Sequence, residues 1–341
     1  MKKTRNKRFT PTLPATRTLL LRADQMEVVA EGCKATEWKL PASTVNLHWT
    51  NECNMRCCYC FATFKDIPDY LESLTREEIK ELVRKLRRAG MAKLNVTGGE
   101  PILRLEETLS VLREAKAVGC YTSLGTNGAY LSTAVIEQLR ESKVDMIALS
   151  IDLIVSETNE AIGRTVADRS FTHTDYLDLC TRTRSAGIKL KINTVVTTHN
   201  IQEDLLSFIQ QVDPDRWKIL QAINVHGQNE HSVRKVQVSS DDFMKYARKC
   251  RTAEDSGADV IVESEDMIRG SYIMIDRVGR FFDDTKGHHS YSERILEVGV
   301  EQAFKQVCFD REKYEKRNGD YLEESPEVNP LDKQGSKKVQ P

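Results

Sequence analysis

Three cysteines on one short stretch constrain this chain more than any other feature of its sequence. The stretch runs from Val45 to Phe61 and holds Cys53, Cys57 and Cys60 in the spacing Cys-x3-Cys-x2-Cys. Thiolates are soft ligands that suit iron–sulfur clusters. Because three cysteines leave one iron of a [4Fe–4S] cluster without a protein ligand, the spacing predicts a cluster that is open to a small molecule.

Two other uses of these cysteines fit the sequence less well. A structural zinc site needs a fourth ligand, and no second Cys-x2-Cys or His pair follows; His48 lies on the predicted strand before the loop. A disulfide needs an oxidising compartment, whereas five of the nine cysteines are scattered, as expected for reduced thiols in a cytosol. Cys58 is assigned no role.

Strand-like and helix-like segments alternate along the chain from residue 43. Strands are predicted at 43–50, 92–97, 120–125, 145–151, 189–196 and 216–223, and helices at 75–89, 105–118, 131–141, 172–186 and 201–212. The strand at 145–151 is nearly all apolar, as strands buried on both faces are. This alternation favours an α/β fold, a partial (βα)6 barrel with its site at the carboxyl ends of the strands.

The pattern divides the chain into four expected parts. These are a flexible lead-in at 1–40, the barrel at 41–223, an α+β C-terminal extension at 224–324 and a disordered tail at 325–341. A net charge of -1 excludes a broad electrostatic footprint for nucleic acid. The apolar run Leu19–Leu21 is too short for a signal peptide or a membrane span, so a cytoplasmic protein is expected.

Gly98–Pro101, with the sequence Gly-Gly-Glu-Pro, stands where the second predicted strand ends. Two glycines let the backbone approach a ligand closely, and their carbonyls can accept hydrogen bonds from a bound amine. An ordinary strand-to-helix turn is the alternative, but the position downstream of the cysteine triad favours a ligand site. Asn127 and Ser150 lie at the ends of the next two strands, where each alone would be an ordinary turn or capping residue.

Cations recur on the last two predicted barrel strands. Because side chains alternate faces along a strand, Lys189, Lys191 and Asn193 share one face. Arg216 and Lys218 share a face of the next strand in the same way. If helices cover the outside, these cations point into the lumen and need an anion such as a polyphosphate. Lysines that guard an open sheet edge are the alternative, and the recurrence favours phosphate.

The cysteine triad followed by Gly-Gly-Glu-Pro resembles the radical S-adenosylmethionine (SAM) superfamily, including the aromatic Tyr59 before the last cysteine. The resemblance implies a partial barrel of the radical SAM type, with SAM chelated by the open iron. An electron from the cluster would break a carbon–sulfur bond of SAM and release a 5′-deoxyadenosyl radical. The resemblance also assigns SAM contacts to a set of strand-end residues: Tyr59, Gly98, Gly99, Glu100, Pro101, Asn127 and Ser150.

A narrower resemblance runs in order from about residue 43 to Tyr321. The segments that carry it are Ser43–Thr50, Lys93–Pro101, Ile162–Arg164, Lys191–Asn193, Arg216–Lys218, Ser271–Tyr272, Leu296–Glu301 and Lys316–Gly319, the last in the family's gating segment. They are similar to those of viperins, antiviral radical SAM enzymes. Membership would imply dehydration of a ribonucleoside triphosphate to its 3′-deoxy-3′,4′-didehydro analogue, a chain terminator for polymerases.

The viperin resemblance also implies which residues hold the substrate. Triphosphate contacts fall to Lys93, Thr97, Arg164, Lys191, Asn193, Arg216 and Lys218. Asn46, His48 and Tyr272 would lie around the sugar and the base, and no residue is assigned the proton transfer. Tyr272 keeps the family position associated with nucleotide choice, which favours CTP. Glu265 would favour bases that offer an amine or a ring N–H, unless it faces solvent.

Two departures from vertebrate viperins bear on the partners. Residues 1–40 do not resemble their amphipathic membrane helix, and Lys337–Pro341 replaces their terminal tryptophan, which serves cluster assembly. We therefore expect a monomer with no membrane or nucleic-acid partner and another route through the iron–sulfur assembly machinery. An electron donor such as a flavodoxin or ferredoxin would supply the reducing electrons.

Two other classes of function stay open at this stage. One is a radical SAM enzyme that acts on a peptide or a cofactor precursor. Such enzymes often carry additional clusters, whereas Cys250 and Cys308 are lone and far apart. The other is a non-catalytic iron–sulfur sensor, which has no use for an amine site at Gly98–Pro101.

Overall fold

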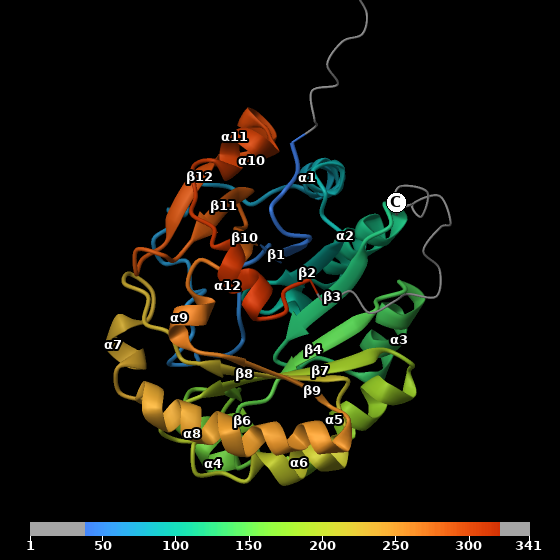
Figure 1. Cartoon of the computed structure of the whole chain (residues 1–341). Coiled ribbons are helices and arrows are strands. Elements are labelled where there is room, and N and C mark those ends of the chain that lie inside the picture. Colours follow the sequence, from blue (N-terminus) through green and yellow to red (C-terminus); the bar gives the residue numbers. More distant parts are fainter. Residues whose placement is uncertain (1–37, 321–341) are drawn as a thin grey trace, which may run out of the picture. The chain divides into compact units, whose positions relative to one another are not determined.

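The structure, a computed structural model, describes residues 38–320, so the expected tail and all but the last three residues of the expected lead-in lie outside it. A ten-stranded sheet organises the described residues (Figure 1). Its strands are β1 (Thr44–His48), β2 (Lys93–Thr97), β3 (Tyr121–Thr126), β4 (Met146–Ser150), β7 (Lys189–Val196), β8 (Arg216–Gln221), β9 (Asp259–Glu263), β10 (Ile273–Ile275), β11 (Arg280–Asp283) and β12 (Ser290–Arg294). β5 (Thr165–Val166) and β6 (Arg169–Ser170) form a separate pair.

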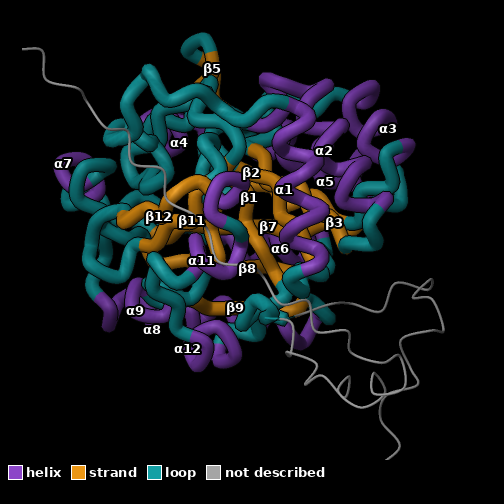
Figure 2. The backbone as a smooth tube through the Cα atoms, turned by 90° about the horizontal axis from the view of Figure 1, so that it is seen from above, coloured by secondary structure: helices purple, strands orange, loops and turns teal. Residues whose placement is uncertain are grey.

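Helices surround the strands, as Figure 2 shows from above. They are α1 (Arg76–Arg88), α2 (Leu105–Ala117), α3 (Thr133–Glu141), α4 (Ser156–Ala161), α5 (His173–Ser185), α6 (Leu205–Val212), α7 (Glu230–Val233), α8 (Ser240–Cys250), α9 (Glu265–Ile268), α10 (Ile295–Val298), α11 (Val300–Phe304) and α12 (Arg311–Lys316), with 3-10 turns η1 (Pro101–Arg104) and η2 (Arg251–Ser256). No helix in the described part of the chain combines the length and the apolar character that a membrane span requires.

The strand order is β12-β11-β10-β1-β2-β3-β4-β7-β8-β9. Neighbours pair in parallel from β10 through β9, and β11 and β12 add two antiparallel strands beside β10. The six strands β1, β2, β3, β4, β7 and β8 are those predicted, so the partial barrel is confirmed. Strands of the expected extension continue the same sheet on both sides, and the boundary at residue 223 stays a prediction.

Local sequence explains where the helices of this barrel begin. Thr75 starts α1 with a capping box, in which its hydroxyl accepts from the Glu78 N–H while the Glu78 side chain bonds back. The helix then buries Leu82 and Leu86, each worth about 2 kcal/mol of apolar burial. The helix predicted from residue 201 instead begins after Asp204, whose side chain accepts from the Ser207 N–H and caps α6.

The two ends of the parallel strands present different residues. Gly98–Pro101 follows the last residue of β2, and Asn127 follows the last residue of β3. Lys93 and Arg216 are instead the first residues of β2 and β8. The glycine-rich turn therefore lies at the carboxyl ends of the strands, and these two cations lie at the amino ends.

Candidate active site

The cysteine loop between β1 and α1 is held by hydrogen bonds to a distant segment of the backbone. The Arg56 N–H donates to the carbonyl oxygen of Gly163 at 3.0 Å, and the Cys58 N–H donates to that of Ile162 at 3.0 Å. Gly163 has a φ of +77°, and a Cβ there would lie 2.2 Å from the Arg56 carbonyl oxygen. The end of α4 therefore fixes the middle of the loop, and glycine is required at that contact.

The buried thiols of the loop would have to lose their protons to bind a cluster. Burial raises the pKa of Cys57 and raises that of Cys60 to about 12, so ligand binding would have to deprotonate both thiols. Among the described residues, no three His, Cys, Asp or Glu side chains converge as ligands of one ion would. In a cluster each thiolate binds a different iron, so such convergence is not required.

The Gly-Gly-Glu-Pro turn packs directly on the beginning of the cysteine loop. The Gly99 N–H donates to the Thr50 carbonyl oxygen at 2.7 Å, and the Glu100 N–H donates to that of Glu52 at 2.6 Å. A Cβ on Gly98 would lie 2.4 Å from the Thr50 oxygen, and one on Gly99 would lie 2.0 Å from the Glu52 oxygen. The two glycines are therefore required by the approach of the loop itself.

Glu100 connects the ends of two strands through its buried carboxylate. The carboxylate accepts hydrogen bonds from the N–H groups of Ile102 and Asn127, at 3.0 and 2.8 Å, and from the Thr126 hydroxyl at 2.8 Å. Burial raises the pKa of Glu100, and these hydrogen bonds act in the opposite direction. Pro101 follows as the first residue of η1. The Glu100 side chain thus supports the turn from within the protein.

Asn127 and Ser150 lie beside the loop at the ends of β3 and β4. The Asn127 amide donates to the Asn54 side-chain oxygen at 2.7 Å, and its own oxygen accepts from the Ala129 N–H at 2.9 Å. The carbonyl oxygen of Ser150 accepts from the Arg164 guanidinium at 2.6 Å. The structure brings both residues near the cysteine loop, and their contacts with SAM stay predictions.

Arg164 lies behind the cysteine loop and apart from the other predicted triphosphate residues. Its guanidinium pairs with Asp152 at 3.1 Å and donates to the Tyr59 hydroxyl at 3.1 Å, while the Tyr59 hydroxyl donates to Asp152. The same guanidinium lies 4.0 Å from the Cys57 sulfur. Asp152 was missed in the sequence, although an acid directly after an apolar strand is a recognisable signal.

A cavity of about 280 Å³ opens beside the loop and is lined by seven of the ten predicted substrate-binding residues. The sequence-predicted residues that line it are Asn46, His48, Tyr59, Cys60, Thr97, Gly98, Lys191, Asn193, Lys218 and Tyr272. The other lining residues are Phe61, Ala62, Asn95, Val195, Leu220, Gln221, Ala222, Ile223, Ile268, Met274 and Asp284. One cavity thus joins the cysteine loop to two of the predicted phosphate-binding lysines.

Lys93 and Arg216 lie outside this lining. Lys93 is 1% exposed, and its ammonium group lies 4.9 Å from the centre of the Tyr121 ring. Arg216 is 2% exposed and pairs with Asp259 of the neighbouring strand β9. The structure places both cations at the amino ends of the strands, and their contacts with phosphate stay predictions.

A network of buried charges lies against one side of the cavity, where Lys218 and Tyr272 line it. Lys218 pairs with Glu263 at 2.6 Å and donates to the Tyr272 hydroxyl at 2.9 Å, and the Tyr272 hydroxyl donates to Glu263. Arg317 lies 3.5 Å from the Glu263 carboxylate and stacks 3.7 Å from the centre of the Tyr272 ring. We refer to Lys191, Lys218, Glu263, Tyr272 and Arg317 as the charged cluster.

The pKa values of this charged cluster follow from burial and from the neighbouring charges. Burial alone would raise the pKa of Glu263, but Lys218 and Arg317 outweigh it and lower that pKa to about 2. Burial lowers the pKa of Lys191 to about 8, and the charge of Glu263 acts against that shift. Glu263 is therefore anionic near neutral pH, and Lys191 is mainly cationic.

The sequence did not identify Glu263 and Arg317 as members of the site. A buried acid at the end of the apolar strand β9 was a usable signal for Glu263. Arg317 lies within the gating-like segment but carried no assigned role. Glu265, expected near the base, instead pairs with Arg269 at 2.6 Å and accepts from the Gln237 amide at 3.0 Å, and it does not line the cavity.

His48 and Asn193 present polar atoms that a ligand could satisfy. His48 is 6% exposed and packs against the rings of Phe64 and Phe282. Burial lowers the pKa of His48 to about 3, so its imidazole is neutral at neutral pH. The His48 Nδ1 and the Asn193 Oδ1 have no hydrogen-bond partner among the described residues. Because buried polar atoms are normally satisfied, both suit a cavity that holds a polar ligand.

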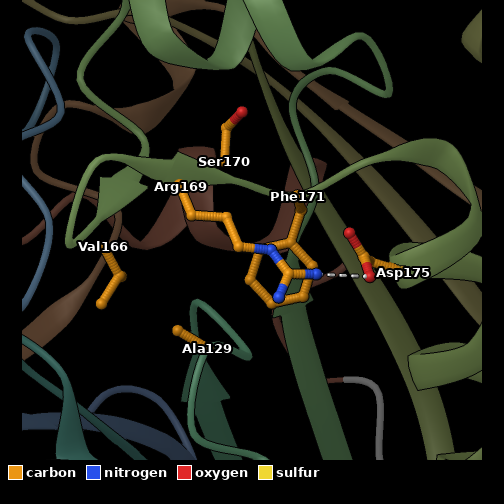
Figure 3. A pocket seen from close by; sticks show the side chains of 6 residues that line it. All are labelled: Ala129, Val166, Arg169, Ser170, Phe171 and Asp175. Atoms are coloured by element: carbon orange, nitrogen blue, oxygen red, sulfur yellow. Dashed lines mark hydrogen bonds and ion pairs between the residues drawn. The ribbon is translucent and has the colours of Figure 1, made fainter.

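A second cavity, of about 290 Å³, lies beside β6 and α5 (Figure 3). Its lining comprises Ala129, Val166, Arg169, Ser170, Phe171 and Asp175. Arg169 and Asp175 pair with each other at 3.1 Å across it. This second cavity holds no predicted site residue, so the cavity beside the cysteine loop is the candidate active site.

Comparison with known proteins relates this chain to the radical SAM superfamily and to nucleotide dehydratases. The model of the radical SAM superfamily matches residues 47–212. An S-adenosylmethionine-dependent nucleotide dehydratase of Flammeovirga pacifica is 35% identical over 281 residues, which cover 82% of this chain and 95% of that protein. The S-adenosylmethionine-dependent nucleotide dehydratase RSAD2 of Danio rerio is 32% identical over 291 residues, which cover 82% of this chain and 78% of that protein.

A third relative is longer than the region that matches. The S-adenosylmethionine-dependent nucleotide dehydratase of Lacinutrix mariniflava is 37% identical over 287 residues, and the match spans 83% of this chain but 59% of that protein. Among solved structures, Streptococcus suis SuiB bound to S-adenosylmethionine gives a TM-score of 0.58 at 17% identity, covering 70% of this chain and 59% of SuiB. Native anSMEcpe with bound AdoMet also gives a TM-score of 0.58 at 14% identity, covering 80% of this chain and 82% of anSMEcpe. These two structures support the fold alone.

Proposed function

The chain belongs to the S-adenosylmethionine-dependent nucleotide dehydratases of the radical SAM superfamily, and we propose that it dehydrates the ribose of a ribonucleoside triphosphate. The proposed product is the 3′-deoxy-3′,4′-didehydro analogue, and CTP is the proposed default substrate. One observation carries this proposal. The same cavity is lined by Cys60 and Gly98 on the side of the cysteine loop and by Lys191 and Lys218 of the charged cluster.

The residues of the cysteine loop fit the cofactors of this superfamily. Cys53, Cys57 and Cys60 would hold a [4Fe–4S] cluster. Of the other cysteines in the described part of the chain, Cys58 alone lies on the same short loop. Tyr59 and Gly98, which line the cavity beside Cys60, would contact SAM. When bound, the two cofactors would supply an electron and a carbon-centred radical.

The charged cluster would bind and orient the triphosphate. Lys191 and Lys218 line the cavity, and each charge-assisted hydrogen bond to phosphate is worth about 1.5–3 kcal/mol. Glu263 would offset the repulsion among the cations before substrate arrives. A substrate anchored there by its phosphates would extend its sugar towards the cysteine loop, which is the orientation that the reaction needs.

The remaining lining would position the sugar and exclude water. A neutral His48 can donate one hydrogen bond and accept another, so it suits the ribose hydroxyl groups better than the phosphates. Phe61, Ile223, Ile268 and Met274 give the cavity apolar walls. Such walls protect a reactive intermediate from side reactions with solvent.

The proposed activity also needs partners outside the chain. A flavodoxin or ferredoxin would supply electrons, and the iron–sulfur assembly machinery would load the cluster. We propose that the protein works in the cytoplasm as a monomer. These assignments follow from the proposed chemistry.

The proposal is tested by anaerobic incubation of the reconstituted protein with SAM, dithionite and each of the four ribonucleoside triphosphates in turn. We expect 5′-deoxyadenosine together with a nucleotide that is one water lighter than its parent, both detected by mass spectrometry. The matched control uses the corresponding nucleosides, which should stimulate SAM cleavage far less because they lack phosphate. Equal stimulation by nucleoside and triphosphate would contradict the assigned role of the charged cluster.

A further inference from the structure

Asp284 is the one carboxylate among the described residues that line the active-site cavity. It follows β11 directly and is 1% exposed. One of its carboxylate oxygens accepts a hydrogen bond from the Gly270 N–H at 3.1 Å. A buried carboxylate needs several donors, and this position lies in the wall of a cavity that is large enough for a ligand.

The backbone around Asp284 is held firmly, so its side chain has a defined place. Phe282 of β11 pairs with Met274 of β10, and continuing this antiparallel register brings Asp284 to the level of Tyr272. The Arg269 guanidinium donates to the Asp284 carbonyl oxygen at 3.1 Å. Asp284 and Tyr272 therefore border the same part of the cavity.

The other polar side chains on this side of the cavity are engaged within the protein. The Gln221 side-chain oxygen accepts from the Glu265 N–H at 2.9 Å, and its amide donates to the Val238 carbonyl oxygen at 3.3 Å. Glu265, which the sequence had placed near the base, is held by Arg269. Asp284 is thus the acidic group best placed to recognise a ligand here.

The lining separates into parts that suit different ends of a nucleotide. Lys191 and Lys218 suit phosphate, whereas a carboxylate repels it. Asp284 lines the cavity together with the apolar side chains of Ile223 and Ile268, a surface that suits the flat faces of a nucleobase. A carboxylate there can only accept hydrogen bonds, so it selects for a base edge that donates.

We propose that Asp284 is a specificity-determining residue that accepts a hydrogen bond from the exocyclic amine of cytosine or adenine. This inference rests on the proposed function and names its substrate class. Uracil and hypoxanthine carry a carbonyl oxygen where cytosine and adenine carry the amine, so they place an acceptor against an acceptor. Burial raises the pKa of Asp284, and the Gly270 hydrogen bond and the Arg269 charge lower it, which helps to keep an acceptor in place.

The test uses two pairs of triphosphates that differ at this edge of the base, CTP with UTP and ATP with ITP. Equilibrium binding to the reconstituted holoenzyme is measured first, and conversion in competition is measured second. We expect the parent to bind the amine-bearing member of each pair about 10- to 100-fold more tightly. Asp284→Asn, whose amide both donates and accepts, should lower that ratio to about 3-fold or less.

Two further variants serve as controls for the measured selectivity. Asp284→Glu keeps the acceptor and should retain a preference for the amine, which loss of folding would not produce. Glu265→Gln changes a nearby carboxylate outside the lining and should leave both ratios unchanged. SAM binding by each variant verifies that the rest of the site is intact.

The outcomes separate this inference from the proposed function. Conversion of CTP and UTP with equal efficiency by the parent, or an unchanged ratio in Asp284→Asn, overturns the role of Asp284 and leaves the dehydratase proposal standing. A preference for amines in binding, without dehydration of any triphosphate, supports Asp284 and overturns the proposed reaction. Absence of binding by all four triphosphates overturns both.

Discussion

The cysteine loop and the charged cluster border one cavity, but different forces hold them. The loop is fixed by backbone hydrogen bonds to two other segments, the Gly-Gly-Glu-Pro turn and the end of α4. The charged cluster is fixed by side-chain ion pairs among Lys218, Glu263 and Arg317, all buried. Backbone contacts depend on shape and on the absence of a Cβ, whereas ion pairs depend on charge and on pH.

This difference matters because the two regions must perform different tasks. In the proposed function the loop would hold cofactors in one geometry, which rigid backbone contacts can do. The charged cluster would accept an anionic substrate, so its cations need a partner that neutralises them in the free protein. Glu263 fills that role, and it explains how several cations can be buried together before a nucleotide binds.

The largest effect is expected at the cysteine triad. Cys57→Ala should lower the iron content of the reconstituted protein at least about tenfold, because the cluster loses one of three protein ligands. Iron analysis and the visible absorption spectrum measure this. Cys58→Ala is the matched control, since the backbone N–H and carbonyl of Cys58 form hydrogen bonds that the substitution leaves in place. A Cys57 variant that loads iron normally would contradict the ligand assignment.

The charged cluster should respond most strongly to loss of its carboxylate. Glu263→Gln leaves Lys218 and Arg317 without a buried counterion and should destabilise the protein by about 3–5 kcal/mol, measured by denaturant unfolding. Glu265→Gln removes a partly exposed ion pair and should cost about 1 kcal/mol or less. Equal losses of stability in the two variants would contradict the role of Glu263 as a buried counterion.

The pH dependence of stability follows from the same carboxylate. The pKa of Glu263 is lowered from 4.5 to about 2 in the folded protein, so its contribution is fully present above pH 4.5. That contribution, roughly 3 kcal/mol, is lost as the pH falls from 4.5 through 2. Between pH 4.5 and 2, the free energy of unfolding should fall less in Glu263→Gln than in the parent. An equal fall in the two proteins would contradict the lowered pKa.

A methyl group in the Gly-Gly-Glu-Pro turn tests whether close backbone contacts hold the cysteine loop. Gly99→Ala places a Cβ 2.0 Å from a backbone oxygen and should destabilise the protein by about 1–3 kcal/mol, with loss of iron loading. Gly125→Ala is the control, because its Cβ would first meet the Thr97 hydroxyl oxygen at 3.1 Å. The melting temperature and the iron content report the two effects. A neutral Gly99→Ala variant would show that the turn can move.

The last prediction concerns nucleotide affinity, and it leaves the fold and the iron content unchanged. Lys191→Ala should weaken triphosphate binding by about 1.5–3 kcal/mol at neutral pH, without changing iron content. Lys189→Ala, on the same strand but outside the lining, is the control. Because the pKa of Lys191 is about 8, affinity in the parent should fall as the pH rises through 8, and this step should be absent from Lys191→Ala. Calorimetric titration at several pH values measures both.

Much of the fold could be predicted because its signals are local. Six parallel strands lie within two residues of their predicted bounds, and the helix predicted from Thr75 has Thr75 as its cap. The cysteine spacing and the Gly-Gly-Glu-Pro turn are contiguous motifs, so their pairing in one site could be anticipated. Strands β9, β11 and β12 were not predicted, because they are short and lie in a segment without clear alternation.

Alternation along β7 and β8 identified Lys191 and Lys218, and both reach the cavity. The same reasoning could not find their counterion, since Glu263 comes from β9 and Arg317 from the end of α12. The viperin resemblance, not alternation, assigned Arg164 to the triphosphate; the structure pairs it with Asp152 beside the cysteine loop, and its contact with phosphate stays a prediction. Strand periodicity tells which face a side chain takes, but not which distant charge will meet it.

The sequence by itself determined the cofactor chemistry and the barrel, because cysteine spacing, glycine turns and hydrophobic periodicity act over a few residues. Only the tertiary structure decided how the substrate side is built. The local signal of Glu263, an acid at the end of an apolar strand, does not tell which charges it will meet. Glu263, Asp284 and Arg317 join the site through pairings between segments far apart in the chain. Their burial sets the pKa values of the site, and burial exists only once the strands have come together.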